Sequence, residues 1–203
     1  MVGGGAAGII ATKALREHPG WEVVTYEGSS RIGGMWSWGA HEDSSVPYTL
    51  ARHYESLTTN LSSPVMGLSD YQMSPEKFPK ALIPHEDVRH FLESYAAEFD
   101  LLDSIQLEHE VHSVAPEEDG SWKVTVHAEG DGEREESFDA VVVCTGHYGR
   151  PFMPHIEGLD SFPGEVGHSQ DYLSVDAPGK GMGSVRGESH FFWTGGEGSN
   201  MGR

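Results

Sequence analysis

The sequence is poor in several kinds of residue, beginning with cysteine: Cys144 is the single one among 203 residues. One thiol excludes an internal disulfide, a CxxC redox pair and a four-thiolate metal site, and it favours a reducing compartment. Apolar runs are short as well. None approaches the roughly 18 consecutive apolar residues of a membrane-spanning helix, and the first residues lack the features of a signal peptide. We therefore expect a cytoplasmic protein without a membrane segment.

Basic residues are also scarce. The sequence has 13 Lys and Arg residues against 32 Asp and Glu residues, which gives a formal net charge of -19. Such a charge repels phosphate backbones and anionic lipid headgroups, so nucleic acids and acidic membranes are excluded as partners. Any anionic cofactor must then be held by local backbone N–H groups, because the overall field opposes its approach.

Glycine, in contrast, is abundant, with 26 residues. Gly3, Gly5 and Gly8 form a GxGxxG pattern, in which the glycines permit a tight turn, backbone approach to a pyrophosphate and close helix packing, respectively. We expect residues 3–18 to be a glycine turn leading into a helix, and residues 21–26 to be a buried strand. Only two residues precede the turn as a first strand. In a glycine-rich chain, a plain turn is the alternative interpretation.

An acidic residue stands where a dinucleotide-binding motif requires one. Glu27 lies nineteen residues after Gly8, at the end of the expected strand. A carboxylate at this position accepts hydrogen bonds from the ribose hydroxyls of a dinucleotide. A solvated surface glutamate is the alternative.

A second glycine segment follows at residues 31–36. It is similar to the second glycine signature of flavoproteins that bind two dinucleotides, and it favours FAD over NAD. The pair Gly33 and Gly34 would let the backbone close over the diphosphate. Trp36 either covers the cofactor or is an ordinary core aromatic.

The remaining pattern predicts further helices and strands. A helix begins at His85 because apolar residues recur at helical spacing as far as Phe99. Residues 140–143 form a continuous apolar run, typical of a strand buried on both faces. The other expected segments are an irregular stretch over 28–84, strands over 104–114, 122–127 and 137–143, and a glycine-rich tail without apolar periodicity over 173–203.

Residues 54–60 resemble the stretch that supplies a flavin-contacting asparagine in the flavin-containing monooxygenases, a family of class B flavoprotein monooxygenases. The resemblance places Asn60 at that asparagine, which acts in oxygenation, with Leu57 and Thr58 as neighbouring cofactor contacts. Ser63 departs from the family pattern, which commonly has a lysine there.

Two later segments extend the resemblance. Val111 matches a residue whose backbone lies by the adenine in relatives, and Thr145-Gly146 matches the end of the strand where the chain leaves the FAD domain. Cys144 is then structural. A catalytic thiol next to His147 is the weaker alternative.

The most specific similarity is the FxGxxxHxxx(Y/F) signature of the family, matched by Phe162, Gly164, His168 and Tyr172. Tyr172 replaces the Trp-Pro ending of Baeyer–Villiger relatives and favours oxygenation of a heteroatom. His168, by resemblance, organises a domain junction.

The resemblance implies an α/β fold, a two-dinucleotide-binding (Rossmann-like) FAD domain in residues 1–172 that is truncated at both ends. The NADPH domain would be largely absent from the tail, 173–203. Residues 195–199 faintly echo an NADPH-binding turn, but we expect none there because the tail lacks a preceding strand.

The implied function is that of an FAD- and NADPH-dependent monooxygenase. It would insert one atom of O2 into a small molecule with a soft nitrogen or sulfur nucleophile, as N,N-dimethylaniline monooxygenases do. A flavin disulfide reductase is excluded by the single cysteine. A non-catalytic FAD-binding fragment or degenerate paralogue remains the alternative, and we expect the 203-residue chain to be inactive by itself.

Overall fold

The structure is a computed structural model that describes residues 1–37, 56–128, 130–147, 152–163, 166–168 and 192–194. It has two units. The first comprises Met1–Pro47 and Thr58–Gly146, and the second comprises Tyr48–Leu57 and His147–Arg203.

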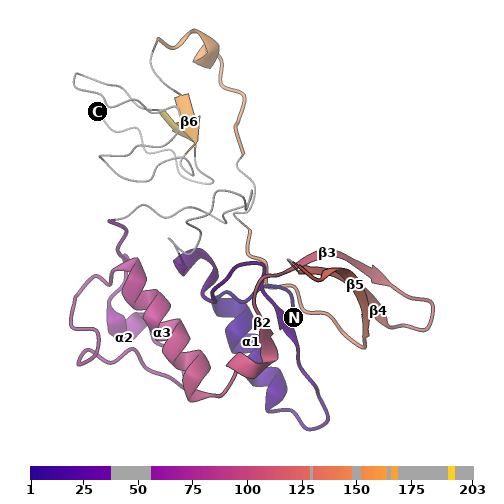
Figure 1. The fold of residues 1–203 in the computed structure, drawn as a ribbon. Coiled ribbons are helices and arrows are strands. Elements are labelled where there is room, and N and C mark those ends of the chain that lie inside the picture. The colour runs from indigo at the N-terminus through magenta and orange to yellow at the C-terminus, as the bar shows by residue number, and fades with distance from the viewer. Residues whose placement is uncertain (38–55, 129, 148–151, 164–165, 169–191, 195–203) are drawn as a thin grey trace. The chain divides into compact units, whose positions relative to one another are not determined.

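The first unit is organised by short parallel strands (Figure 1). Strand β1, Thr25–Tyr26, pairs in parallel with β2, Ile105–Gln106. Val2 forms parallel bridges with Tyr26 on one side and with Val143 on the other. The order is therefore β2, β1, Val2 and Val143, so the strand order reverses direction at Val2. Such a reversal is the topological switch point at which doubly wound α/β sheets bind their ligands.

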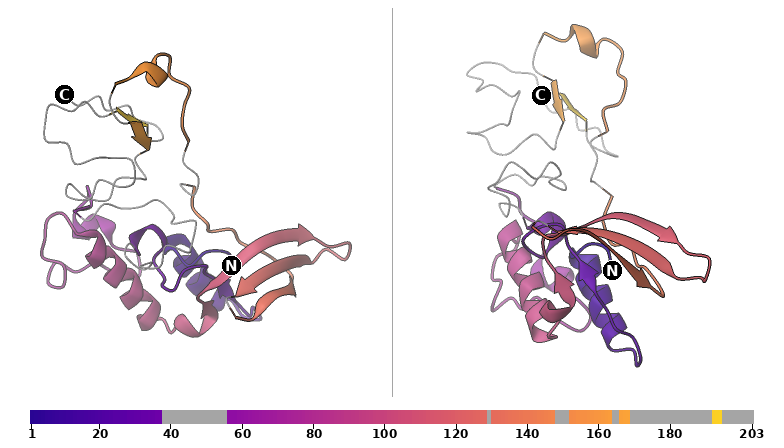
Figure 2. Two further views of the ribbon diagram at one scale, coloured as in Figure 1. Left: turned by 45° about the horizontal axis from the view of Figure 1, so that its top comes forward. Right: turned by 45° about the vertical axis from the view of Figure 1, so that its right-hand side comes forward.

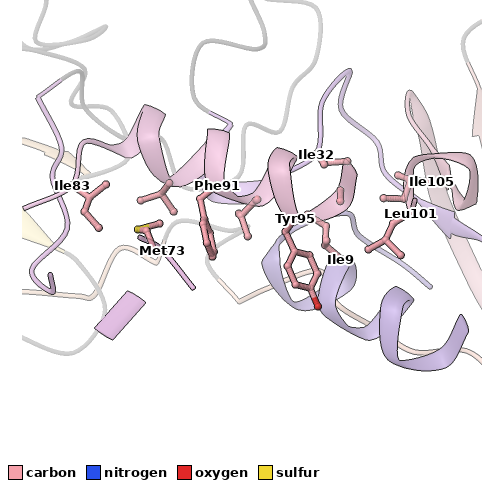
Figure 3. Packing of buried hydrophobic residues seen from close by; sticks show 11 residues of the cluster. Ile9, Ile32, Met73, Ile83, Phe91, Tyr95, Leu101 and Ile105 are labelled. Atoms are coloured by element: carbon pink, nitrogen blue, oxygen red, sulfur yellow. The ribbon is translucent and has the colours of Figure 1, made fainter. Parts of the chain in front are cut away.

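Two helices enclose the main hydrophobic core of this unit. Helix α1, Ala6–Arg16, connects Val2 to β1, and α3, His85–Glu98, lies beside it (Figure 1). The helix predicted from His85 is thus confirmed, and Glu86 and Asp87 in its first turn complement the helix dipole. Figure 3 shows the shared core, whose buried residues are Ile9, Ile32, Met73, Ile83, Val88, Phe91, Leu92, Tyr95, Ala96, Leu101 and Ile105.

A three-stranded antiparallel meander connects β2 to Val143 (Figure 2). Its strands are β3, His109–Pro116, β4, Trp122–Ala128, and β5, Gly132–Phe138. Val124 and Val126 of β4 pack with Tyr26 of β1 in a second cluster, so one face of the meander is covered. The other face carries charged side chains, as is usual for an antiparallel sheet with one wet side.

The other elements are short. In the first unit they are η1, Gly34–Trp36, α2, Ser63–Met66, and η2, Leu102–Ser104. The second unit contains η3, Leu159–Ser161, β6, Val166–His168, and β7, Phe192–Thr194. Within the described ranges, no helix has the length and apolar character needed to cross a membrane.

The strands predicted over 21–26 and 137–143 differ from the structure in extent and in burial. Residues 21–24 are outside β1 and Trp21 is 49% exposed. Among the described residues, the parallel pairing with Val2 and β2 involves Thr25 and Tyr26. Residues 140–143 are not a strand buried on both faces: Val143 is 66% exposed and, among the described residues, makes a single bridge, to Val2.

The strand expected over 137–143 lies earlier in the chain, since β5 spans Gly132–Phe138 and shares only residues 137–138 with it. Its charged residues 133–136 resemble a loop in sequence, but they pair with β4. The tail prediction also needs correction. Strand β7 pairs in parallel with β6 and ends directly before Gly195, so a strand does precede the glycine echo at 195–199, which lies outside the described residues.

Candidate functional site

The glycine turn lies at the carboxyl end of the parallel strands, where Val2 passes into α1. Gly3 has φ +101°, and a Cβ there would stand 2.7 Å from the carbonyl oxygen of Cys144. A Cβ on Gly8 would overlap the carbonyl oxygen of Gly3. These two glycines are therefore required by the protein's own backbone, which folds tightly between strand and helix.

Gly5 is different, because nothing described in the protein requires a glycine there. Its φ of -72° and ψ of -177° are open to any residue. The nearest described atom to an added Cβ is Gly34 Cα, at an ordinary 3.5 Å. A glycine that the fold does not need keeps the backbone open to a ligand, which is the role of the second glycine in a pyrophosphate-binding turn.

The N-terminus of α1 supplies the electrostatics for such a ligand. Gly5 is its N-cap and provides no side-chain hydrogen bond, and the first turn carries no acidic residue. The first N–H groups of a helix have no partner within the helix and bear partial positive charge. These N–H groups attract a phosphate locally, whatever the net charge of the chain. The residues present therefore fit the diphosphate of a dinucleotide.

Glu27 follows β1 directly and its carboxylate is held by three donors. The Gly4 N–H donates to Oε2 at 2.6 Å. The Ser29 N–H and hydroxyl donate to Oε1 at 2.9 and 2.6 Å. Glu27 is only 5% exposed, so the alternative of a solvated surface glutamate is wrong. The carboxylate lies beside the glycine turn, as a ribose-binding acid must.

The second glycine segment closes on the first. The Gly33 N–H donates to the Gly4 carbonyl at 3.0 Å, and Gly33 forms a parallel bridge with Gly5. Gly34 has φ +56°, and a Cβ there would stand 2.9 Å from Gly5 Cα. Trp36 is half-buried and packs against the main core. Its core role is thus observed, and its role as a cofactor cover stays a prediction.

Thr145 and Gly146 follow Cys144 after the bridge at Val143, and Thr145 Cα lies 3.4 Å from the position of a Cβ built on Gly3. The Cys144 N–H donates to the Val2 carbonyl at 2.8 Å, which fixes the end of the strand beside the glycine turn. Burial raises the pKa of the Cys144 thiol. A raised thiol pKa disfavours the thiolate and so agrees with a structural cysteine.

Val111 lies on β3, half-buried beside the cluster that contains Tyr26.

Thr58 forms an antiparallel bridge with Pro84, and the hydroxyl oxygen of buried Thr59 accepts a hydrogen bond from the Ile83 N–H at 3.0 Å. These contacts fix the loop that carries Asn60, whose side chain is exposed.

The remaining predicted residues belong to the second unit, where Leu57 is half-buried, Phe162 follows η3 and His168 ends β6. Gly164 and Tyr172 lie outside the described residues.

Sequence reasoning missed two residues of the site, Gly4 and Ser29. Gly4 occupies an unspecified position of the GxGxxG pattern, yet its N–H binds Glu27 and its Cβ position is 3.0 Å from Glu27 Cβ. The available signal for Ser29 was its place two residues after an acid, a common spacing for local side-chain to backbone hydrogen bonds.

Comparison with known proteins places this geometry in a family. A family model described as flavin-binding monooxygenase-like matches residues 1–181. "Flavin-containing monooxygenase FMO GS-OX-like 1" of Arabidopsis thaliana is 36% identical over 188 residues, which cover 87% of this chain and 40% of that protein.

Solved structures of two monooxygenases or oxygenases are also similar to this chain. That of S-allyl-L-cysteine S-oxygenase from Allium sativum has a TM-score of 0.75 and 35% identity, and the match covers 85% of this chain and 41% of that one. Oxidized steroid monooxygenase bound to NADP has a TM-score of 0.57 and 27% identity, with coverage of 83% and 29%.

The chain thus spans about 40% of the length of the first relatives that it matches. The predicted truncated α/β flavoprotein fold is confirmed, and the predicted FAD and NADPH agree with the family and with the NADP-bound steroid monooxygenase. Because the family model covers most of its residues, including both glycine segments and the acid between them, the chain belongs to the flavin-binding monooxygenase-like family.

Proposed function

We propose that this chain is the FAD-binding part of an NADPH-dependent monooxygenase that transfers one oxygen atom from O2 to a soft sulfur or nitrogen nucleophile of a small molecule. The observation that carries the proposal is the convergence of the α1 N-terminus, the Gly33–Gly34 segment and the buried Glu27 carboxylate. A sulfur substrate is favoured because S-allyl-L-cysteine S-oxygenase is 35% identical.

Each group in the site has a distinct part in binding. The N–H groups at the start of α1 would receive the diphosphate, and Gly5 would let it approach the backbone. Glu27 would accept hydrogen bonds from the adenosine ribose. Gly33 and Gly34 would close over the diphosphate, with Trp36 beside them. When bound, the flavin supplies the redox chemistry with NADPH and O2, and the protein orients it and excludes water.

The first test is cofactor selection by the 203-residue chain. After refolding with FAD, FMN or NAD and removal of free nucleotide, we expect a flavin absorbance spectrum with FAD only. The adenylate half provides the ribose and diphosphate contacts, so FMN lacks most of the binding free energy. Retention of FMN in preference to FAD would contradict the dinucleotide site.

Activity is tested in a chimera in which this chain replaces the matching part of the Allium sativum S-oxygenase. We expect O2-dependent NADPH oxidation coupled to S-oxygenation of S-allyl-L-cysteine. The 203-residue chain alone should show no NADPH turnover. A chimera that retains FAD but oxidises no NADPH, beside an active parent enzyme, would favour the non-catalytic FAD-binding alternative.

Asn60 is proposed to contact the flavin during oxygenation, with its exposed side chain presented by the loop that Thr59 anchors. In the chimera, Asn60→Ser should leave FAD retention unchanged but lower S-oxide formation by about 100-fold, in line with the loss of one preorganised hydrogen-bond donor. Hydrogen peroxide released per NADPH should rise correspondingly. An unchanged ratio of S-oxide to hydrogen peroxide would show that Asn60 has no part in oxygenation.

A further inference from the structure

Hydrogen bonds around Glu27 connect the first glycine segment to the residues that lead into the second. Gly4 donates to Glu27, Ser29 donates to Glu27, and Ser29 Oγ also lies 2.7 Å from the carbonyl oxygen of Arg31. Two residues after Arg31, the Gly33 N–H donates to the Gly4 carbonyl at 3.0 Å, which joins the two glycine segments directly. Both Glu27 and Ser29 are buried.

We propose that Ser29 is a positioning residue that holds the Glu27 carboxylate in the orientation required by the adenosine ribose. This inference rests on the proposed FAD-binding function and assigns a part in it to a residue outside both glycine patterns. Ser29 acts through Glu27, so its contribution concerns the adenylate half of the cofactor alone.

The hydrogen-bond inventory supports this role. A carboxylate has about four lone-pair sites. Ser29 donates twice to Oε1, through its N–H and its hydroxyl, and Gly4 donates once to Oε2. Three donors on two oxygens fix the plane of the carboxylate and leave about one acceptor site, on Oε2, for a ribose hydroxyl. Without the hydroxyl, Oε1 loses one of its two donors, and the carboxylate gains freedom to rotate.

Neighbouring contacts keep Ser29 itself in place. Its carbonyl accepts the Glu108 N–H at 3.0 Å, and the Glu27 carbonyl accepts the His109 N–H at 2.9 Å. Ile32, one residue after Arg31, is buried in the main core near Ile9 (Figure 3). The backbone on both sides of the hydroxyl is therefore anchored. The hydroxyl has one hydrogen, and the charged carboxylate is a stronger acceptor for it than the Arg31 carbonyl.

The test compares FAD with its 2′-deoxyadenosine analogue as ligands of the 203-residue chain, using flavin fluorescence to measure Kd. Ser29→Ala should weaken FAD binding about tenfold, as expected for a lost charge-assisted hydrogen bond. The same substitution should change the Kd of the analogue by less than about twofold. The analogue lacks the 2′-hydroxyl that would donate to Glu27, so its binding does not depend on how the carboxylate is oriented. Ser29→Thr keeps the hydroxyl and should restore FAD binding.

Ser113→Ala is the matched control, since it removes a serine hydroxyl bonded to Thr125 on the exposed meander face. Ser29→Cys keeps the size but offers only a weak donor, and it should reproduce the loss if Ser29→Ala does not fold. Equal weakening of FAD and analogue, or unaltered FAD binding by both Ser29→Ala and Ser29→Cys, overturns the role of Ser29. Failure of the unmodified chain to bind FAD overturns the proposed function as well, so the two failures are distinguishable.

Discussion

Replacing Gly8 with Ala is expected to destabilise the first unit by about 3 kcal/mol or more, because overpacking against backbone lies at the upper end of such costs. The added Cβ would overlap the Gly3 carbonyl oxygen, so either the turn or the start of α1 must move. Urea unfolding followed by circular dichroism measures the change, and flavin retention should be lost with it.

Gly28→Ala provides the matched control for this substitution. Within the described ranges, the nearest atom to a Cβ there is Glu110 Cβ, at an ordinary contact distance of 3.8 Å. The stability of this variant should lie within about 0.5 kcal/mol of the unmodified chain.

Gly5→Ala should affect FAD affinity without affecting folding stability. An alanine at Gly5 meets only ordinary contacts among the described residues, so stability should be nearly unchanged. FAD affinity should still fall at least tenfold, because the methyl group would stand between the backbone and the diphosphate. Equal FAD affinity in Gly5→Ala and the unmodified chain would contradict the placement of the diphosphate at this turn.

Glu27→Gln should lower both the folding stability and the FAD affinity, even though the side chain keeps its shape. Both carboxylate oxygens accept hydrogen bonds, Oε2 from Gly4 and Oε1 from Ser29. The amide has one acceptor oxygen, so in either orientation its NH2 group faces a buried donor. Such an opposed donor costs about 1–3 kcal/mol of folding stability.

FAD affinity in Glu27→Gln should fall by about 10- to 100-fold, which is the loss of about 1.4–2.8 kcal/mol of charge-assisted bonding to the ribose. Thermal unfolding and fluorescence titration measure the two effects separately. Glu118→Gln, at an exposed position in the turn between β3 and β4, is the control and should change neither quantity. A Glu27→Gln variant with full stability and full affinity would show that the carboxylate charge has no role.

Local sequence patterns predicted the parts of this molecule in which one segment decides its own structure. The helix at His85 has apolar residues at helical spacing, and it formed as expected over His85–Glu98. The turn at Gly3–Gly8 leads into α1 because a glycine pattern specifies backbone angles and close packing at fixed positions. The spacing between Gly8 and Glu27 reflects the length of a helix and a strand, so it placed the acid beside the turn.

Strand boundaries were harder to predict from the sequence, because pairing partners set them more than the intrinsic preference of each residue does. The apolar run at 140–143 has the composition of a buried strand, but in the described part of the chain Val143 pairs with Val2 alone. The charged residues 133–136 have the composition of a loop, but they complete the ladder along β4.

The sequence by itself determined the family, the glycine turn, the ribose acid and the long helix, because each depends on residue types at fixed spacing along the chain. Only the tertiary structure decided how the two glycine segments meet, that Glu27 is buried under three donors, and that Gly4 and Ser29 belong to the site. Hydrogen bonds depend on distances of about 3 Å and on direction, and residues distant in sequence reach such geometry only once the core has positioned their backbones.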